Sequence, residues 1–423
     1  MKLNHWTLAL AAAGVVSMGA VAQAEEATES VKTLISGTTI SGYVSTSALW
    51  NPGTGTAYPA AISAFHGGSN TAGKNDGFNL DHINLTISKA MDEGEWAAGY
   101  KAELWFGDDA FGLATGNRGG AEDLAIKQAY VALRAPVGNG IDFKMGVFDT
   151  PIGHESTNVA DNPHFTRSLA WSLQPTTHTG LSAAYRFNDM FAVTAGIVNG
   201  RGAVINAKNQ NVGGAGGATL GTESSKGYFG GIELTAPDDW GFLAGSKLHA
   251  QVLDSPNTRT ADTLDIHVGA ILNTPVEAWK VGISYYYRGN MTPAALAATT
   301  PGSVFAHAGG KNYASVWGLY NSYQATEKLA LNLRAEYLSA SERTVYLGAA
   351  ADDDPNNEMF SLTTTVDYSL WENVISRLEV RWDTSLTGGG AGDSPFGGVA
   401  AAGGPGADEK NNFLVALNVI YKF

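Results

Sequence analysis

The feature that most constrains this sequence is a series of about 16 segments in which apolar residues recur at every second position. A period of two predicts β-strands, because successive side chains of a strand point to opposite faces. Most segments have close to the roughly 9–11 residues that a tilted membrane-spanning strand needs. The predicted strands lie near residues 39–50, 79–91, 95–106, 123–134, 141–148, 179–187, 190–199, 226–235, 244–254, 262–273, 278–289, 311–324, 327–339, 358–370, 373–384 and 411–423.

The connections between these segments alternate between two length classes. The short ones occupy 91–95, 135–140, 187–190, 236–241, 274–278, 325–328 and 370–373. The long ones occupy 51–78, 107–122, 149–178, 200–225, 290–310, 340–357 and 385–410, with a moderately long connection at 254–262. Short turns at one end and long loops at the other are typical of an up-and-down antiparallel barrel in an outer membrane. An even strand number would place both chain ends on the short-turn, periplasmic side.

The first 24 residues have the pattern of a secretory signal peptide. Lys2 precedes an apolar run, and Ala22-Gln23-Ala24 predicts cleavage near Ala24. We therefore expect a signal peptide at 1–24, a short periplasmic segment at 25–38 and an outer-membrane β-barrel at 39–423. The expected location is the outer membrane of a Gram-negative-type bacterium.

Composition argues against several other classes of protein. The chain has no cysteine, which removes disulfides, Cys-based zinc sites and Cys nucleophiles. Its net charge of -14 disfavours nucleic acid as a partner, because phosphate would repel it. After the signal peptide, no apolar run approaches the roughly 18 residues of a membrane helix. Nine histidines are present without HExxH or His-x-His pairing, so we expect no metal, no cofactor and no catalytic residue.

The two faces of each strand can be assigned to lipid and to lumen. In segment 373–384, Leu378 and Val380 lie opposite Arg377, Glu379 and Arg381. Lipid offers no hydrogen-bond partner to the backbone, so a β-protein crosses it only as a closed barrel. About 16 strands leave an interior too wide for side chains to fill, which predicts an aqueous channel. Aromatic residues that belong at the membrane boundary recur near strand ends: Trp50, Trp105, Phe106, Phe187, Trp240, Trp279, Trp371, Trp382 and Phe423.

Strand parity also assigns a set of polar residues to the lumen. The predicted pore-lining residues are Lys101, Glu103, Lys144, Arg186, Lys247, Asp265, His267, Arg288, Arg334, Glu336, Arg377, Glu379, Arg381 and Asp383. Basic residues outnumber acidic ones in this set, so the acidity of the chain must lie largely in loops and turns. We expect the lumen to favour anions mildly.

The chain ends in NNFLVALNVIYKF, with apolar residues at every second position up to Phe423. One face of this predicted strand is therefore wholly apolar, as contact with lipid requires. The terminal phenylalanine resembles the C-terminal signature by which outer-membrane barrels are recognised for assembly. Barrel-assembly machinery is therefore an expected partner of the chain.

Three neighbouring stretches, GVFDTPIGHE (146–155), DNPHFTRSLAW (161–171) and PTTHTGLSAAYRF (175–187), resemble the beta-barrel porin family of the OmpL-like type. Val147 stands where such proteins often carry Lys or Arg. The resemblance implies channel function without naming a solute. The matching residues are Gly146, Phe148, Thr150, Gly153, Glu155, Asn162, Arg167, Ser168, His178, Thr179 and Gly180.

The same stretch forms the third long loop of the predicted barrel. In classical porins this loop folds inward and narrows the pore, so the resemblance implies a constriction role. The alternative is a loop held at the rim by its own hydrogen bonds. The constriction candidates are Asp149, His154, Glu155, Asp161, His164, Arg167 and His178.

The sequence thus predicts an outer-membrane porin through which small hydrophilic solutes diffuse passively. One alternative is a substrate-specific channel, for example for sugars or anions, with Tyr286 and Trp105 as inward aromatic residues. Another is a non-conducting surface adhesin or a barrel enzyme, although no Ser-His arrangement at a lipid edge is apparent. Outer-membrane lipids are expected partners, and barrels of this size are often homotrimers.

Overall fold

The computed structural model describes residues 31–32, 37–52, 77–113, 115, 123–206, 226–257, 261–291, 312–341, 356–386 and 410–423. The predicted signal peptide at 1–24 and much of the segment at 25–38 lie outside these residues. The long strands are β2 (Thr39–Trp50), β3 (Gly77–Lys89), β4 (Ala97–Phe106), β5 (Leu124–Ala135), β6 (Ile141–Asp149), β7 (Thr177–Arg186), β8 (Phe191–Val198), β9 (Gly227–Thr235), β10 (Lys247–Asn257), β11 (Ala261–Asn273), β12 (Trp279–Met291), β13 (Asn312–Gln324), β14 (Leu329–Ser341), β15 (Asn356–Tyr368), β16 (Val374–Ser385) and β17 (Asn411–Lys422).

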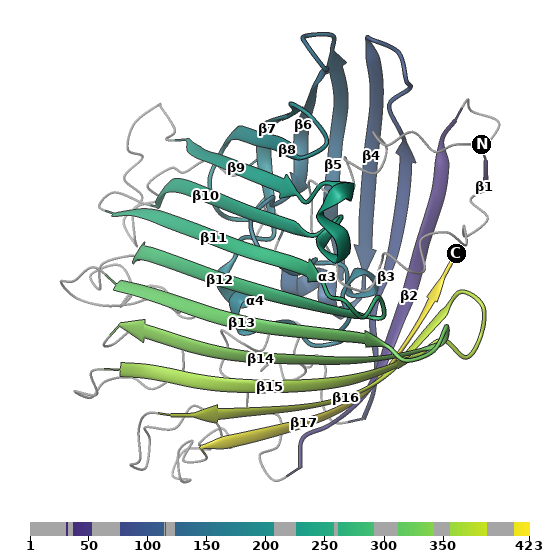
Figure 1. Cartoon of the computed structure of the whole chain (residues 1–423), viewed down its shortest axis with the longest axis vertical. Coiled ribbons are helices and arrows are strands. Elements are labelled where there is room, and N and C mark those ends of the chain that lie inside the picture. The colour runs from purple at the N-terminus through teal and green to yellow at the C-terminus, as the bar shows by residue number, and fades with distance from the viewer. Residues whose placement is uncertain are drawn as a thin grey trace.

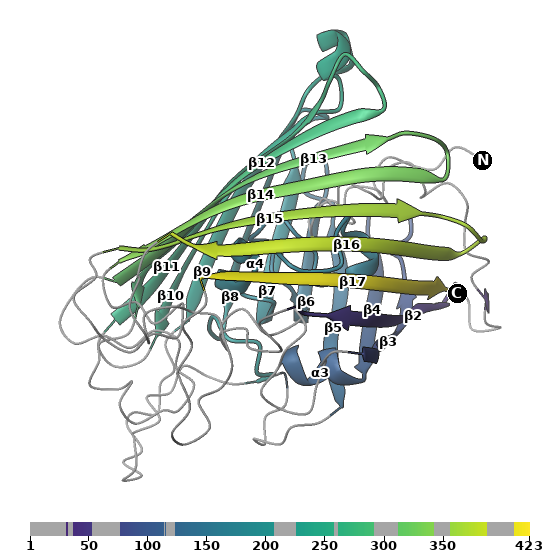
Figure 2. The same ribbon diagram turned by 90° about the horizontal axis from the view of Figure 1, so that it is seen from below.

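These strands form one closed antiparallel barrel of 16 strands, which confirms the predicted fold class. Each strand pairs with its sequence neighbours, and β17 pairs with β2 to close the sheet. A further short strand, β1 (Val31–Lys32), pairs with the start of β2 and was not predicted. Figures 1 and 2 show the long strands wrapped around a common interior, with the C-terminus at the same end as the β15–β16 turn.

The chain end completes the closure of the barrel. The amide of Gly42 donates to the carbonyl of Phe423 at 2.9 Å, and the amide of Phe423 donates to the carbonyl of Gly42 at 3.0 Å. The last strand also has the predicted division of faces: Leu417 is 47% exposed, whereas Leu414 and Ile420 are fully buried. The wholly apolar face therefore points outward, where lipid is expected, and leaves no strand edge open at this seam.

Most of the predicted boundary aromatics are exposed on the outside of the barrel. Trp240, Trp279 and Trp371 lie at short turns and are exposed, and Trp96, which was not predicted, joins them. Trp382 is half-buried, and Trp105 is fully buried inside the barrel. Amphipathic rings at the ends of the strands are the arrangement expected at a membrane–water boundary.

The helices of the described ranges are short and lie between strands. They are α3 (Asp108–Leu113), η1 (Val159–Asp161), α4 (Leu169–Leu173) and η2 (Asp238–Leu243). Among the residues that the structure describes, no helix is long and apolar enough to cross a membrane.

Two β-bulges change which residues face inward. Between β2 and β3 the register shifts around Asp81, so that Asp81 and His82 are both buried. Between β4 and β5 it shifts around Lys127, so that Lys127 and Gln128 are both buried. An extra residue on one strand reverses the inward–outward alternation beyond it.

Candidate functional site: the barrel lumen and its inward loop

The connection between β6 and β7, residues 150–176, runs into the barrel and is called the inward loop below. Most of its residues are buried, including Ile152, Phe165 and Leu169. Its hydrogen-bond partners lie on β14, β15, β16 and β17. In the closed order of 16 strands, β14 is eight strands from β6 in either direction, which is the opposite wall. The inward loop therefore crosses the lumen.

Two glutamates of the opposite wall accept hydrogen bonds from the backbone of the inward loop. Glu379 of β16 accepts from the amides of Phe165 at 2.7 Å and Thr166 at 2.9 Å. Glu336 of β14 accepts from the amide of Leu169 at 2.8 Å, at the start of α4. These contacts give amides of the loop an acceptor on the opposite wall and so fix the loop to it.

Three arginines of the same wall donate to carbonyl oxygens of the inward loop. Arg377 donates to Asn162 at 2.6 Å, Arg381 donates to Arg167 at 2.6 Å, and Arg334 donates to Thr166 at 2.8 Å. All three guanidinium groups are buried. The wall thus supplies both acceptors for the amides of the loop and donors for its carbonyls.

Glu155 links the inward loop to the opposite wall and also bonds to another part of the loop. Its carboxylate lies 2.8 Å from Arg334 and also accepts from the amide of Ser168 at 2.8 Å. Gly153, two residues before Glu155, has a φ of 127°, a backbone conformation that a residue with a side chain rarely adopts. This turn positions the buried pair formed by Glu155 and Arg334.

The remaining constriction candidates occupy different parts of this region. His164 lies 2.7 Å from the hydroxyl of Thr365 on β15. Arg167 donates to the carbonyl of Thr157 within the loop at 2.6 Å. His178 is on β7 rather than in the loop, where it lies 3.0 Å from the hydroxyl of Thr150. Both wall contacts and internal hydrogen bonds therefore hold the loop.

Burial governs the charge of two histidines in the inward loop. The pKa of His154 is lowered to about 4, because burial disfavours the charged imidazole. The pKa of His164 is lowered by burial and further by the positive charges of Arg334, Arg377 and Arg381. Both imidazoles are neutral near pH 7.

The wall from which the loop departs carries a compact charged cluster. Lys127 lies 2.6 Å from Asp149 and 3.7 Å from Glu103, while Lys101 lies 2.8 Å from Glu103. Gln128 donates to Glu103 at 2.7 Å. Strand parity predicted Lys101 and Glu103 as lumen residues, and Asp149, predicted in the constriction loop, is the last residue of β6. Lys127 was missed because the bulge at that residue reverses the alternation.

A third group of predicted lumen residues is partly exposed. The side chains of Arg186 and Lys247 are 22% and 24% exposed, and both face the single carboxylate of Glu233 at 3.8 and 3.5 Å. Lys144 is half-buried, lies 5.3 Å from the ring centre of Tyr130, and makes no ion pair within the described part of the chain. Basic charge therefore exceeds acidic charge on this side.

The other predicted lumen residues are buried. Asp265 pairs with Arg201 at 2.7 Å and accepts from Tyr286 at 2.9 Å. Asp383 accepts from Arg381 at 2.9 Å. His267 and Arg288 lie on β11 and β12 and are also buried.

Sequence reasoning missed a polar cluster on the wall formed by β2, β3 and β4. His82 lies 2.7 Å from Asp109 and 2.7 Å from the hydroxyl of Tyr43, and its ring stacks on Trp105 with 4.0 Å between ring centres. The neighbouring Asp81 is also buried. The outward-facing residues of β3 alternate in one phase before Asp81 and in the opposite phase after it. That change was the sequence signal for this cluster.

The two inward aromatic residues do not face open space. Tyr286 and Trp105 are both fully buried, Tyr286 against Asp265 and Trp105 against His82. A row of accessible rings along which a sugar could slide is therefore not formed by this pair.

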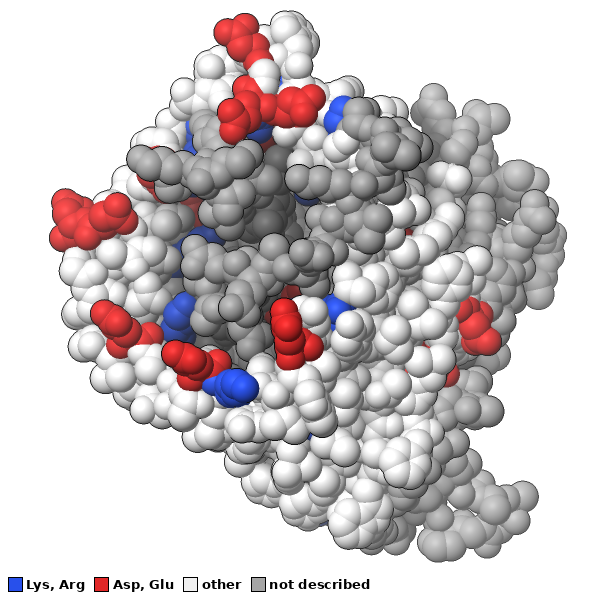
Figure 3. Space-filling view, turned by 90° about the vertical axis from the view of Figure 1, so that its right-hand side faces the viewer, with Lys and Arg blue, Asp and Glu red and all other residues white. Residues whose placement is uncertain are grey.

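Acidic residues gather at the short-turn end of the barrel. Figure 3 shows carboxylates around a hollow and basic residues on its inner wall. The exposed acidic residues of the short turns are Asp92, Glu93, Glu95, Asp189, Asp238, Asp239, Glu277, Glu327 and Glu372. The chain can therefore have a net charge of -14 although basic residues outnumber acidic ones in the lumen, because much of the acidic charge lies on this rim.

Comparison with known proteins identifies one family and several similar folds. The family model described as "Putative beta-barrel porin-2, OmpL-like" matches residues 37–423. Among curated proteins, none matches the chain significantly.

Several similar solved structures have titles that name an outer-membrane protein or a porin. The outer membrane channel DcaP of Acinetobacter baumannii is 13% identical, with 91% of this chain and 97% of that chain covered and a TM-score of 0.56. The anion-selective porin from Comamonas acidovorans is 12% identical, with 91% and 99% covered and a TM-score of 0.54. OmpT of Vibrio cholerae in its trimer form is 12% identical, with 91% and 99% covered and a TM-score of 0.53. At these identities the likeness concerns the fold.

Proposed function

Since the chain belongs to the OmpL-like beta-barrel porin family, it is an outer-membrane porin, and we propose that small hydrophilic anions are its favoured solutes. They would diffuse passively along the side of the lumen formed by β4, β6, β7 and β10. The carrying observation is that the partly exposed cations Arg186 and Lys247 share the single carboxylate of Glu233, while Lys144 makes no ion pair within the described part of the chain.

The opposite wall contributes little to solute contact in this proposal. Its arginines Arg334, Arg377 and Arg381 are buried under the inward loop and are already paired with carboxylates or loop carbonyls. A solute cannot reach a buried guanidinium without displacing the loop. The inward loop therefore acts as the constriction, and the accessible charge that filters solutes lies on the side from which the loop departs.

Reversal potentials in planar bilayers under a salt gradient test this proposal. We expect the wild-type protein to conduct in steps and to favour chloride over potassium. The triple variant Lys144→Gln, Arg186→Gln, Lys247→Gln should lose that preference, because three accessible positive charges are removed. Lys328→Gln is the matched control, since Lys328 is exposed in the β13–β14 turn rather than facing the lumen, and it should behave like the wild type.

Two results would contradict the proposal in different ways. A wild-type reversal potential that favours cations would remove the anion preference while leaving the channel intact. A silent bilayer would instead favour the alternative of a surface adhesin or a barrel enzyme. A sugar-specific channel is less well supported, because Tyr286 and Trp105 are fully buried.

We further propose the expected partners and processing of this porin. Cleavage near Ala24 would release the mature chain, outer-membrane lipids would surround the exposed apolar face, and barrel-assembly machinery would recognise Phe423. A homotrimer is proposed because the similar OmpT was solved in a trimer form. Light scattering of the detergent-solubilised protein would distinguish a trimer from a monomer.

A further inference from the structure

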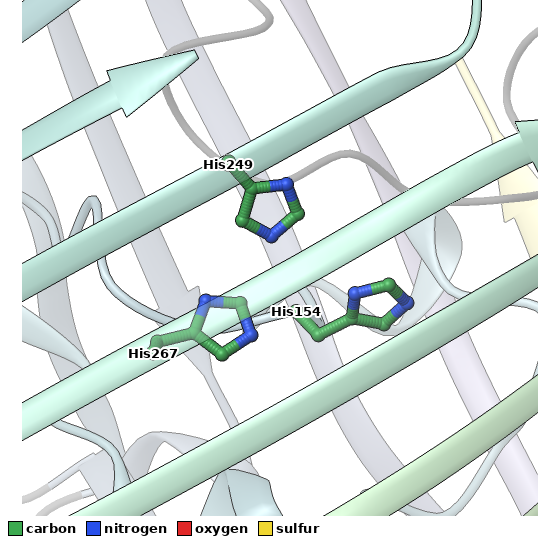
Figure 4. A group of neighbouring side chains, drawn as sticks. All are labelled: His154, His249 and His267. Atoms are coloured by element: carbon green, nitrogen blue, oxygen red, sulfur yellow. The ribbon is translucent and has the colours of Figure 1, made fainter. Parts of the chain in front are cut away.

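Three histidines from separate segments lie together inside the barrel (Figure 4). His154 belongs to the inward loop, His249 to β10 and His267 to β11. Each offers one ring nitrogen, and these three atoms lie within 4.8 Å of one another. The ring centres of His249 and His267 are 4.9 Å apart, and that of His154 lies 6.1 and 6.3 Å from them. Figure 4 shows the rings turned toward a shared space.

The nitrogens of this cluster are available for coordination. Both ring nitrogens of His154 and Nε2 of His249 are buried and have no hydrogen-bond partner in the described structure. Nδ1 of His267 lies 2.7 Å from the amide oxygen of Gln251, which can only accept, so Nδ1 carries the proton. The lone pair of His267 is then on Nε2, which lies 3.1 Å from the hydroxyl of Ser284. Buried polar atoms without partners are uncommon in folded proteins.

We propose that His154, His249 and His267 bind a divalent transition-metal ion of the zinc class. Three imidazoles with one remaining position for water or a small anion is a common donor set for such ions. Nitrogens at about 2.05 Å from a tetrahedral ion lie about 3.3 Å apart, so the observed nitrogens approach by at most about 1.5 Å on binding. Rotations of the side chains about χ1 and χ2 provide such a shift.

The surroundings of the cluster support a built site. Gly269 pairs with His249 across the β10–β11 ladder, and a Cβ at Gly269 would lie 2.5 Å from Nε2 of His249 and 3.2 Å from Cε1 of His267. The missing side chain makes room for the His249 ring. Gln251 fixes the proton of His267, as an outer hydrogen-bond partner does for a metal-bound histidine. The ring of Tyr320 packs against His154 with 4.3 Å between centres.

The bound ion would attach the inward loop to a second part of the barrel wall. The carboxylates and arginines of β14 and β16 fix the loop to the opposite wall, whereas His154 faces β10 and β11. A metal ion at the three histidines joins the loop to this nearer wall and adds positive charge beside the lumen. Metal binding should therefore change conductance as well as loop rigidity.

Titration with Co²⁺ of the untagged protein, purified from outer membranes and stripped with a chelator, tests the site. We expect one tightly bound Co²⁺ per chain with the intense visible absorption of a tetrahedral nitrogen site, and competition by Zn²⁺. His154→Gln, His249→Gln and His267→Gln should each weaken binding by more than about 100-fold. Gln251→Leu should weaken it about 10–100-fold, the usual effect of losing an outer hydrogen-bond partner.

Two further variants separate coordination from folding. His82→Gln is the matched control, because His82 is a buried histidine on β3 outside both the cluster and the inward loop, and it should bind Co²⁺ like the wild type. Gly269→Ala keeps all three ligands but displaces the His249 ring, so it should weaken binding. Each variant is accepted only if it retains the heat-modifiable electrophoretic mobility of a folded barrel.

Conductance gives a second readout that does not depend on solute preference. Micromolar Zn²⁺ should alter wild-type single-channel conductance reversibly, and chelator should restore it, while His154→Gln should not respond. The proposal is overturned if folded His→Gln variants bind Co²⁺ as the wild type does. It is also overturned if the wild type shows only weak, six-coordinate binding. Neither of these results bears on whether the barrel conducts anions.

Discussion

Replacement of Glu379 by alanine should release the inward loop from the opposite wall. The buried carboxylate accepts hydrogen bonds from the amides of Phe165 and Thr166 and from the hydroxyl of Thr365, at 2.7, 2.9 and 2.7 Å. Each hydrogen bond to a charged group contributes about 1.5–3 kcal/mol. The two amide contacts alone then contribute about 3–6 kcal/mol to docking of the loop. Losing even the lower value raises the ratio of undocked to docked loop by about 100-fold, at 1.4 kcal/mol per factor of ten.

Single-channel recording is the direct measurement of this effect. An undocked loop no longer crosses the lumen, so Glu379→Ala should show larger conductance steps or frequent transitions between a small and a large step. Glu379→Gln is the matched variant, because its amide oxygen still accepts one hydrogen bond while the charge is lost, and it should have an intermediate effect. Barrel stability should change little, because the strand ladders of β15–β16 and β16–β17 are retained.

The result that would refute this reasoning is specific. If Glu379→Ala keeps wild-type step size and wild-type protection of the loop from protease, the carboxylate does not hold the loop. The contacts of Glu336 and of the three arginines would then carry the docking by themselves.

Three further predictions concern pH, the chain end and the turn of the inward loop. Burial and the charges of Arg334, Arg377 and Arg381 lower the pKa of His164, with Glu379 3.9 Å away as the facing carboxylate. Docking of the inward loop is therefore fully stable above the ordinary histidine pKa of about 6.5 and weakens as pH falls below it. Single-channel conductance should rise on acidification. His164→Gln should reduce this pH dependence of the conductance. Deletion of Phe423 removes the two backbone hydrogen bonds to Gly42 and should reduce the heat-modifiable barrel in outer-membrane fractions, whereas Phe423→Tyr should not. Gly153→Ala should destabilise docking by about 1–3 kcal/mol, because φ is 127° there, and protease should cut the loop faster.

The fold could be predicted from sequence because its determinants are local. The outward residues of β17, such as Leu417, and its inward residues, such as Leu414, alternate without interruption. The period of two together with sorted loop lengths therefore sufficed to define strand order and closure. The bulges were also visible, although unused: Leu124 and Ile126 face outward before Lys127, and Val131 and Leu133 face outward after it, so the parity changes between them.

The interior could not be predicted because its contacts are distant in sequence. Arg334 meets Glu155 across 179 residues, and the three clustered histidines come from one loop and two strands. The alternation of residues along a strand indicates which residues face inward, but it does not indicate which other residues cover them. The predicted excess of basic residues in the lumen included Arg334, Arg377 and Arg381, but these three side chains are buried under the inward loop.

The alternating charges on β14 and β16 have a different cause from the one that the sequence suggested. The series Arg377, Glu379, Arg381 and Asp383 looks like a compensated, water-facing lumen. In the structure these groups are buried: the arginines donate to carbonyls of the inward loop and Glu379 accepts from its amides. A peptide segment presents donors and acceptors in turn, so a wall that binds it needs both signs of charge in turn. Because the series is nearly neutral as a whole, burying it under a loop is far less unfavourable than burying unpaired charges.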